Sequence, residues 1–113
     1  MTDIQITFMS QKWQIRDSKP TELPEDTLGL CDPTTNTIIV NPHLPLHVWQ
    51  QTLGHEICHL IEMTLGLCLT EQQVDVMSTG IIHLLKENPQ LITLYHTKVV
   101  DNEPDSFTQG DYV

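Results

Sequence analysis

Positively charged residues are scarce in this 113-residue chain, which has five Lys and Arg against fifteen Asp and Glu and a formal net charge of −10. Proteins that bind nucleic acids or anionic membranes neutralise phosphates with many basic side chains. Five cations are too few for that task. We therefore expect neither a nucleic acid nor a membrane surface among the partners of this protein.

Cysteine and long apolar runs are also scarce. The three cysteines, Cys31, Cys58 and Cys68, are odd in number and form no C-x-x-C pair, which favours a reducing compartment over a disulfide framework. The N-terminus has no basic start followed by an apolar stretch, and no segment approaches the roughly 18 apolar residues of a membrane-spanning helix. We expect a cytoplasmic protein without a membrane span.

The length and the composition of the C-terminus predict the domain organisation. A chain of 113 residues can form one small hydrophobic core, but not the two-lobed body of a large protease. We expect one domain over residues 1–100. Residues 101–113 begin with Asp-Asn-Glu-Pro-Asp and are predicted to be an acidic, disordered tail.

Alternating apolar and polar residues predict strands in the first 40 residues. Residues 4–8 and 13–16 alternate and indicate one bent strand or a short hairpin. Residues 28–31 and 37–40 are short apolar runs on either side of Asp-Pro-Thr-Thr-Asn, which is typical of a hairpin. Residues 17–27 hold two prolines and several charges, and predict a surface loop.

Helical signals dominate the rest of the chain. Pro45 suits a helix start and Gly66 suits a C-cap, so a helix is predicted over about residues 46–65. Thr70-Glu71-Gln72-Gln73 is typical of a capping box that opens a second helix, which Pro89 ends. We expect the two helices to form a tight antiparallel hairpin, followed by a short helix or an extended segment over residues 91–100.

The first of these helices carries His55-Glu56-Ile57-Cys58-His59, an H-E-x-x-H pattern. Histidines four residues apart lie on one helix face, so both rings can bind the same Zn²⁺. Glu56 lies about 100° around the helix from His55, beside the metal. Zinc with three protein ligands binds a water molecule and lowers its pKa to about 7, and Glu56 is the candidate general base that takes the proton.

Two carboxylates compete for the third ligand position, and both belong to the second helix. In a tight helical hairpin that turns at residues 66–70, the position level with His59 on the returning helix is near residue 76, which favours Asp75. Glu71 is the alternative, because its side chain is longer and a shift of the second helix would bring it level with the histidines. An acidic residue in a first helical turn also has a simpler explanation in capping and the helix dipole.

The remaining histidines have plainer interpretations. His43 and His47 precede the helix and are predicted to be surface residues, and His83 lies too far along the second helix to be a ligand. Tyr95 and His96 are candidates for a donor that stabilises an oxyanion. A fourth protein ligand, for instance His96 or a carboxylate of the tail, would indicate a closed structural site instead of a catalytic one.

These motifs together resemble a known group of proteins. The strand hairpin of residues 28–40, the H-E-x-x-H helix and Glu71-Gln72-Gln73-Val74-Asp75 are similar to the compact H-E-x-x-H zincin metallopeptidases, closest to small proteins of phages and mobile elements grouped with the ImmA/IrrE metallopeptidases. The resemblance covers roughly residues 28–89. In that group the second helix carries E-x-x-A-N/D, which implies Glu71 as the third zinc ligand and Asp75 as a hydrogen-bond partner of a ligand histidine.

We therefore predict an α+β, minimal zincin-like domain in which a small antiparallel sheet packs on the H-E-x-x-H helix and the second, antiparallel helix lies behind it. The strand at residues 37–40 would be the sheet edge near the metal, where an extended peptide could add as another strand. The expected function is zinc-dependent hydrolysis of a peptide or protein substrate. The alternative is a zinc-binding interaction or structural protein, such as a phage accessory factor, that retains the fold without hydrolysis.

Overall fold

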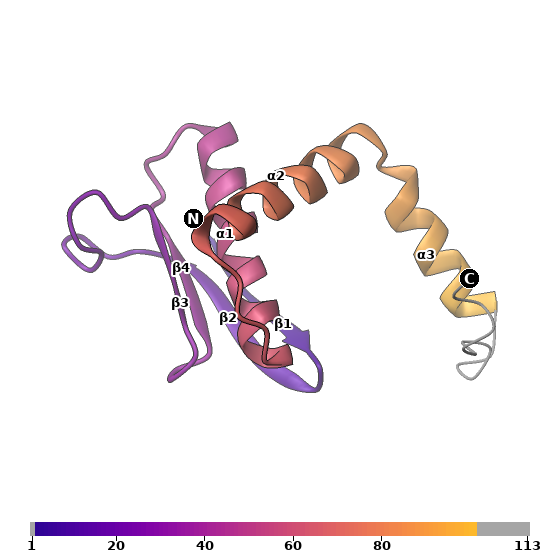
Figure 1. The fold of residues 1–113 in the computed structure, drawn as a ribbon, viewed down its shortest axis with the longest axis horizontal. Helices are drawn as coiled ribbons and strands as arrows, with labels where there is room; N and C mark the ends of the chain where they lie inside the picture. The colour runs from indigo at the N-terminus through magenta and orange to yellow at the C-terminus, as the bar shows by residue number, and fades with distance from the viewer. Residues whose placement is uncertain (1, 102–113) are drawn as a thin grey trace. The chain divides into compact units, whose positions relative to one another are not determined.

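The computed structural model describes residues 2–101, with side chains through residue 97 (Figure 1). The chain divides into two compact units, Met1–Ile82 and His83–Val113, and the division falls within one helix. The expectation of one domain over residues 1–100 stays a prediction. Of the predicted tail, residues 102–113 lie outside the described residues.

The first unit contains a four-stranded sheet whose strands lie in the order β1-β2-β4-β3. Positive φ angles at Met9 and Ser10 form the two-residue turn between the first two strands, so the first alternating segment is a hairpin. Asn36 adopts a left-handed conformation before the last strand. The strands are β1 (Asp3–Phe8), β2 (Gln11–Asp17), β3 (Gly29–Asp32) and β4 (Thr37–Val40).

The sheet is mixed, which corrects the prediction of an antiparallel sheet. β1 and β2 pair antiparallel, as do β3 and β4, but β2 and β4 pair parallel, with Ile15 opposite Ile38. The reason lies in burial. All four residues of β4 are buried, so this strand takes an interior position beside β2, whereas Leu30 of β3 is exposed. The alternation of residues within each segment indicates its own hairpin, but it holds no information on how the two hairpins pair with each other.

The same arrangement changes which strand forms the sheet edge. The prediction that residues 37–40 form the edge is wrong, because β4 lies between β2 and β3. The edge strands are β1 and β3, and β3 is the one beside the H-E-x-x-H motif. Its first residue, Gly29, approaches the H-E-x-x-H helix so closely that an added Cβ would lie 2.8 Å from Thr52 Cγ2 and 3.3 Å from Glu56 Cγ.

The H-E-x-x-H helix, α1 (Leu46–Leu65), packs on the sheet, and its bounds are those predicted (Figure 1). Gly66 ends it in the left-handed conformation, with φ 74°. Leu60 is buried in the core, and other apolar residues of α1 pack around it. The buried core consists of Trp13, Ile15, Ile38, Val40 and Leu60, with Trp49, Leu53, Ile57 and Ile61 of α1 packed against it.

Residues 66–70 connect α1 to α2 (Glu71–Glu87), and their course corrects the predicted tight hairpin. The chain turns at Gly66 and runs back along α1, where the Leu69 backbone N–H donates to Glu62 Oε2 over 2.7 Å (Figure 1). The predicted capping box is confirmed. Thr70 N–H donates to the Gln73 side chain, and Gln73 N–H donates to Thr70 Oγ1.

The second unit contains the end of α2 and the helix α3 (Gln90–Asp101). Asn88 Nδ2 donates to Leu84 O over 3.0 Å at the end of α2, just before Pro89. The sequence left a short helix or an extended segment open for residues 91–100, and the structure has the helix α3 there. None of the helices over residues 2–101 combines the length and apolar character that a membrane span requires.

Candidate metal centre

Two imidazole rings meet on one face of α1. His55 and His59 lie one helical turn apart, and their Nε2 atoms are 3.1 Å from each other. Both side chains are half-buried. The helix alone produces this pair, because residues four apart project from the same face.

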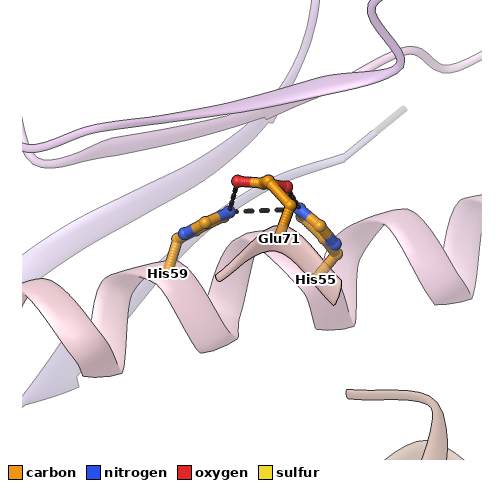
Figure 2. A group of neighbouring side chains, drawn as sticks. All are labelled: His55, His59 and Glu71. Atoms are coloured by element: carbon orange, nitrogen blue, oxygen red, sulfur yellow. Dashed lines mark hydrogen bonds and ion pairs between the residues drawn. The ribbon is translucent and has the colours of Figure 1, made fainter. Parts of the chain in front are cut away.

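Glu71 places its carboxylate against both rings (Figure 2). Its Oε2 lies 3.0 Å from His55 Nε2 and its Oε1 lies 3.0 Å from His59 Nε2. One donor atom from each of these three residues lies within 4.8 Å of the others, a group that could hold a metal ion. Among the described residues, no fourth His, Cys, Asp or Glu joins this group.

Asp75, the favoured third ligand in the sequence prediction, is not part of this candidate group, which instead contains the alternative, Glu71. Asp75 Oδ1 instead lies 2.7 Å from His55 Nδ1, on the opposite side of the ring from the Nε2 atom that faces Glu71. The carboxylate thus has the position of a hydrogen-bond partner of a ligand histidine. The sequence argument placed Asp75 level with His59 because it assumed a tight turn between the helices, and the structure has a longer connection there.

The return of residues 66–70 along α1 explains why Glu71, and not Asp75, lies at the Nε2 atoms of the two histidines. Five residues of extended chain span at most about 17 Å, enough to bring the start of α2 back to the level of the histidines. Glu71 is the first residue of α2, so it arrives at His55 and His59 before Asp75 does. The helix then crosses α1 toward its N-terminal half, where Ile82 lies against Gly54.

Glu62 organises this return. The side chain is buried, its Oε1 lies 2.6 Å from His59 Nδ1, and its Oε2 accepts the Leu69 backbone N–H. The Leu69 N–H and then the hydrogen bond with His59 hold the pKa of the Glu62 carboxyl below its ordinary value. The same residue's backbone carbonyl accepts Leu67 N–H over 2.8 Å. One residue therefore anchors both the ring of His59 and the segment that leads to Glu71.

The hydrogen bonds at Nδ1 decide what the two rings present to each other. If Nδ1–H of His55 donates to Asp75 and Nδ1–H of His59 donates to Glu62, each neutral ring carries its lone pair on Nε2. Two nitrogen lone pairs and a carboxylate then converge with no proton between them. Such a group of acceptors could hold a cation at its centre.

The donor atoms of this group lie close enough together to bind one metal ion. Tetrahedral zinc, with ligand distances of about 2.0–2.2 Å, places its ligand atoms roughly 3.3 Å apart. The two Nε2 atoms are 3.1 Å apart, near this value, and each makes a 3.0 Å contact with a different oxygen of Glu71. Two imidazoles and a carboxylate, with hydrogen-bonded Nδ1 atoms, also form the donor set typical of catalytic zinc sites.

Glu56 lies beside this group without being a member of it. Its side chain is buried between α1 and β3, near Gly29. Burial raises the pKa of the Glu56 carboxyl above its ordinary value. Burial likewise raises the pKa of the neighbouring Cys31 thiol to about 12, so this cysteine is protonated at neutral pH and is no nucleophile.

Two cavities flank the site, and both lie between the edge strand β3 and the helices of the first unit. One, of about 470 Å³, extends toward the N-terminal half of α1. The other, of about 390 Å³, extends toward Met63. Gly29, His55 and Glu56 line both cavities, so the two meet at the candidate metal centre.

The other residues considered from the sequence lie elsewhere. His43, His47 and His83 are exposed, and none belongs to the ligand group. Tyr95 and His96 lie on α3 in the second unit, so their role as oxyanion donors stays a prediction. Sequence reasoning overlooked Glu62, although a signal was present: an acidic residue three positions after His59 in an apolar helix can reach its ring.

No protein-family model, curated protein or solved structure matches this chain.

Proposed function

We propose that this protein is a zinc-dependent metallopeptidase that hydrolyses a peptide bond. One observation carries the proposal: the acceptors of His55, His59 and Glu71 converge in the open cleft beside the carboxylate of Glu56. His55, His59 and Glu71 would hold the zinc ion. This ligand set is the one that the resemblance to compact zincins implies.

The chemistry divides between the ion and the protein. Zinc, when bound, supplies a Lewis acid that polarises a carbonyl and makes water more acidic. Glu56 takes the proton from the attacking water and can pass it to the departing amine. Asp75 and Glu62 hold the imidazole rings in the tautomer that leaves Nε2 free, and β3 and α1 form the walls between which an extended peptide can lie.

The edge of the sheet supports a peptide as the substrate. β3 pairs with β4 on one side only. Its Gly29 lines both cavities, and Leu30 and Cys31 line the one toward Met63. An extended peptide can add to such an edge through main-chain hydrogen bonds. The role that the sequence suggested for residues 37–40 thus passes to residues 29–32.

Glu56→Gln tests the proposal, because it separates binding from hydrolysis. The amide keeps the shape of the side chain but cannot accept the proton. We expect zinc affinity within a few-fold of wild type and loss of hydrolysis of a denatured-protein substrate, measured by metal titration and by mass spectrometry of the products. Glu25→Gln, an exposed carboxylate outside the cleft, is the matched control and should keep both properties.

The result also decides between the proposal and its alternative. Wild-type protein that holds one zinc ion per chain yet cleaves no peptide across a broad substrate mixture would indicate a non-catalytic zinc-binding protein. Wild-type protein that binds no zinc at neutral pH would overturn the metal centre itself.

A further inference from the structure

The cavity of about 470 Å³ beside His55 and Glu56 has a wall with an apolar part and a polar part. Apolar side chains of Leu28 and Val48 form part of the lining. The rest is polar and comes from α1 and from residues of α2 in the same unit. These polar residues are Gln51, Thr52, Asp75, Ser78 and Thr79.

Two of the three hydroxyl groups in this lining, those of Thr52 and Ser78, have already committed their hydrogens. Thr52 Oγ1 donates to Val48 O over 2.8 Å, and Ser78 Oγ donates to Asp75 O over 3.2 Å. A hydroxyl whose only hydrogen is engaged offers a ligand lone pairs alone. Both residues can therefore only accept hydrogen bonds from a ligand.

Asp75 adds a further hydrogen-bond acceptor to this wall. One of its oxygens faces His55 Nδ1, but its side chain is 68% exposed, so the carboxylate remains accessible at the wall of the cavity. An ionised carboxylate accepts hydrogen bonds and donates none. The cavity wall thus offers several acceptors and a negative charge to whatever enters it.

The part of the chain that forms the cleft is also negatively charged. No Lys or Arg lies between Lys19 and Lys86, the segment that supplies every residue of the cleft. Glu56, Glu62, Glu71 and Asp75 gather at the site, and these four carboxylates outnumber the two positive charges of a bound zinc ion. The cleft consequently attracts cations and repels acidic peptides.

We propose that this cavity receives the side chain of a Lys or Arg residue of the substrate, close to the bond that is cleaved. The inference rests on the proposed peptidase function and specifies its substrate class. The aliphatic stem of the basic side chain lies along Leu28 and Val48, and its charged end donates hydrogen bonds to the acceptors of Thr52, Asp75 and Ser78. Gly29 belongs to the same lining, and it leaves no room for a side chain there, because an added Cβ would lie 2.8 Å from Thr52 Cγ2.

Binding to zinc-loaded Glu56→Gln protein tests the inference without hydrolysis. The probes are four nonapeptides of alanine and serine that differ only at the central residue, which is Lys, Arg, norleucine or Glu. Norleucine matches the stem of Lys but lacks its charge. We expect the Lys and Arg peptides to bind at least 10-fold more tightly than the norleucine peptide, with the largest NMR shifts at the amides of Gln51, Thr52 and Thr79.

Gln51→Lys in the same background supplies the charge test. This exposed residue of the lining would place a cation in the cavity, so the preference for basic peptides should disappear. Gln5→Lys makes the same charge change on β1, outside the cavity, and should keep the preference. Thr79→Lys serves as a second variant if Gln51→Lys does not give a folded-protein spectrum.

The outcomes separate this inference from the proposed function. Equal affinities for the four peptides, a preference for the Glu peptide, or NMR shifts confined to other residues would overturn the basic-side-chain cavity. If wild-type protein cleaves all four peptides equally, the peptidase proposal holds and the cavity proposal fails. If the Lys and Arg peptides bind preferentially but no peptide is cleaved, the cavity holds and the peptidase proposal fails.

Discussion

The two histidines of the candidate metal centre have the same chemistry but different support. His59 is held by Glu62, which is buried, belongs to the same helix and accepts a second hydrogen bond from the Leu69 backbone. His55 is held by Asp75, which is exposed and belongs to another helix. The two halves of one site therefore differ in how strongly the fold determines them, and substitutions can measure that difference.

The largest effect is expected from Glu71→Ala, because Glu71 touches both halves at once. The variant loses a charged ligand and leaves two imidazoles, so we expect zinc affinity to fall by more than 100-fold. Zinc should then stabilise the variant less against heat than it stabilises wild type, since binding to the folded state adds to its stability. Competition with a chelator and thermal unfolding with and without zinc measure the two effects.

Glu25→Ala is the control for the loss of an exposed carboxylate and should leave zinc affinity unchanged. The same titration on Asp75→Ala should show the smaller loss. A larger loss in Asp75→Ala than in Glu71→Ala would return the third-ligand role to Asp75.

An intermediate effect is expected from Glu62→Gln. Two donors, His59 Nδ1–H and Leu69 N–H, meet the two oxygens of this carboxylate, whereas the amide of Gln has a single oxygen. One buried donor is left without an acceptor, which costs about 1–3 kcal/mol. We expect a lower free energy of unfolding in metal-free protein and zinc affinity reduced by about 10- to 100-fold.

Amide hydrogen exchange provides a second measurement of how Glu62 holds the His59 side of the site. Leu69 N–H should be protected in metal-free wild-type protein, because Glu62 accepts its hydrogen bond, and should exchange faster in Glu62→Gln. Glu25→Gln should change neither property. Fast exchange of Leu69 in the wild type would show that Glu62 does not hold the return segment.

The smallest effect is expected from Asp75→Asn. Asp75 has one partner in the site, His55 Nδ1, and the Asn side-chain oxygen can accept the same hydrogen bond. The lost charge is largely exposed to solvent, which screens it. We expect zinc affinity to fall by less than 10-fold and the stability of metal-free protein to stay near wild type, as measured by chelator competition and urea unfolding.

Asp26→Asn, an exposed carboxylate far along the sequence in the surface loop, is the matched control. If Asp75→Asn and Glu62→Gln weakened zinc equally, the two halves would be equivalent and the comparison would fail.

The features that could be predicted from the sequence are those with local causes. The bounds of α1, the left-handed Gly66, the Thr70–Gln73 capping box and the spacing of His55 and His59 each depend on a few neighbouring residues. The parallel pairing of β2 with β4 and the selection of Glu71 do not. The first depends on which hairpin strand is more buried. The second depends on the course of residues 66–70, which the hydrogen bond between Leu69 and Glu62, seven residues apart, fastens to α1.

Residues 66–70 have a consequence for protein engineering. Leu67 and Cys68 are exposed and belong to no helix or strand, which ordinarily makes such a connection a good place to insert a tag, a reporter or a linker. Here the length of the connection sets the distance from the buried Glu62 to the first residue of α2. Even a short insertion would carry Glu71 past the histidines, so fusion partners belong in the β1–β2 turn at Met9 and Ser10, on the opposite edge of the sheet from β3.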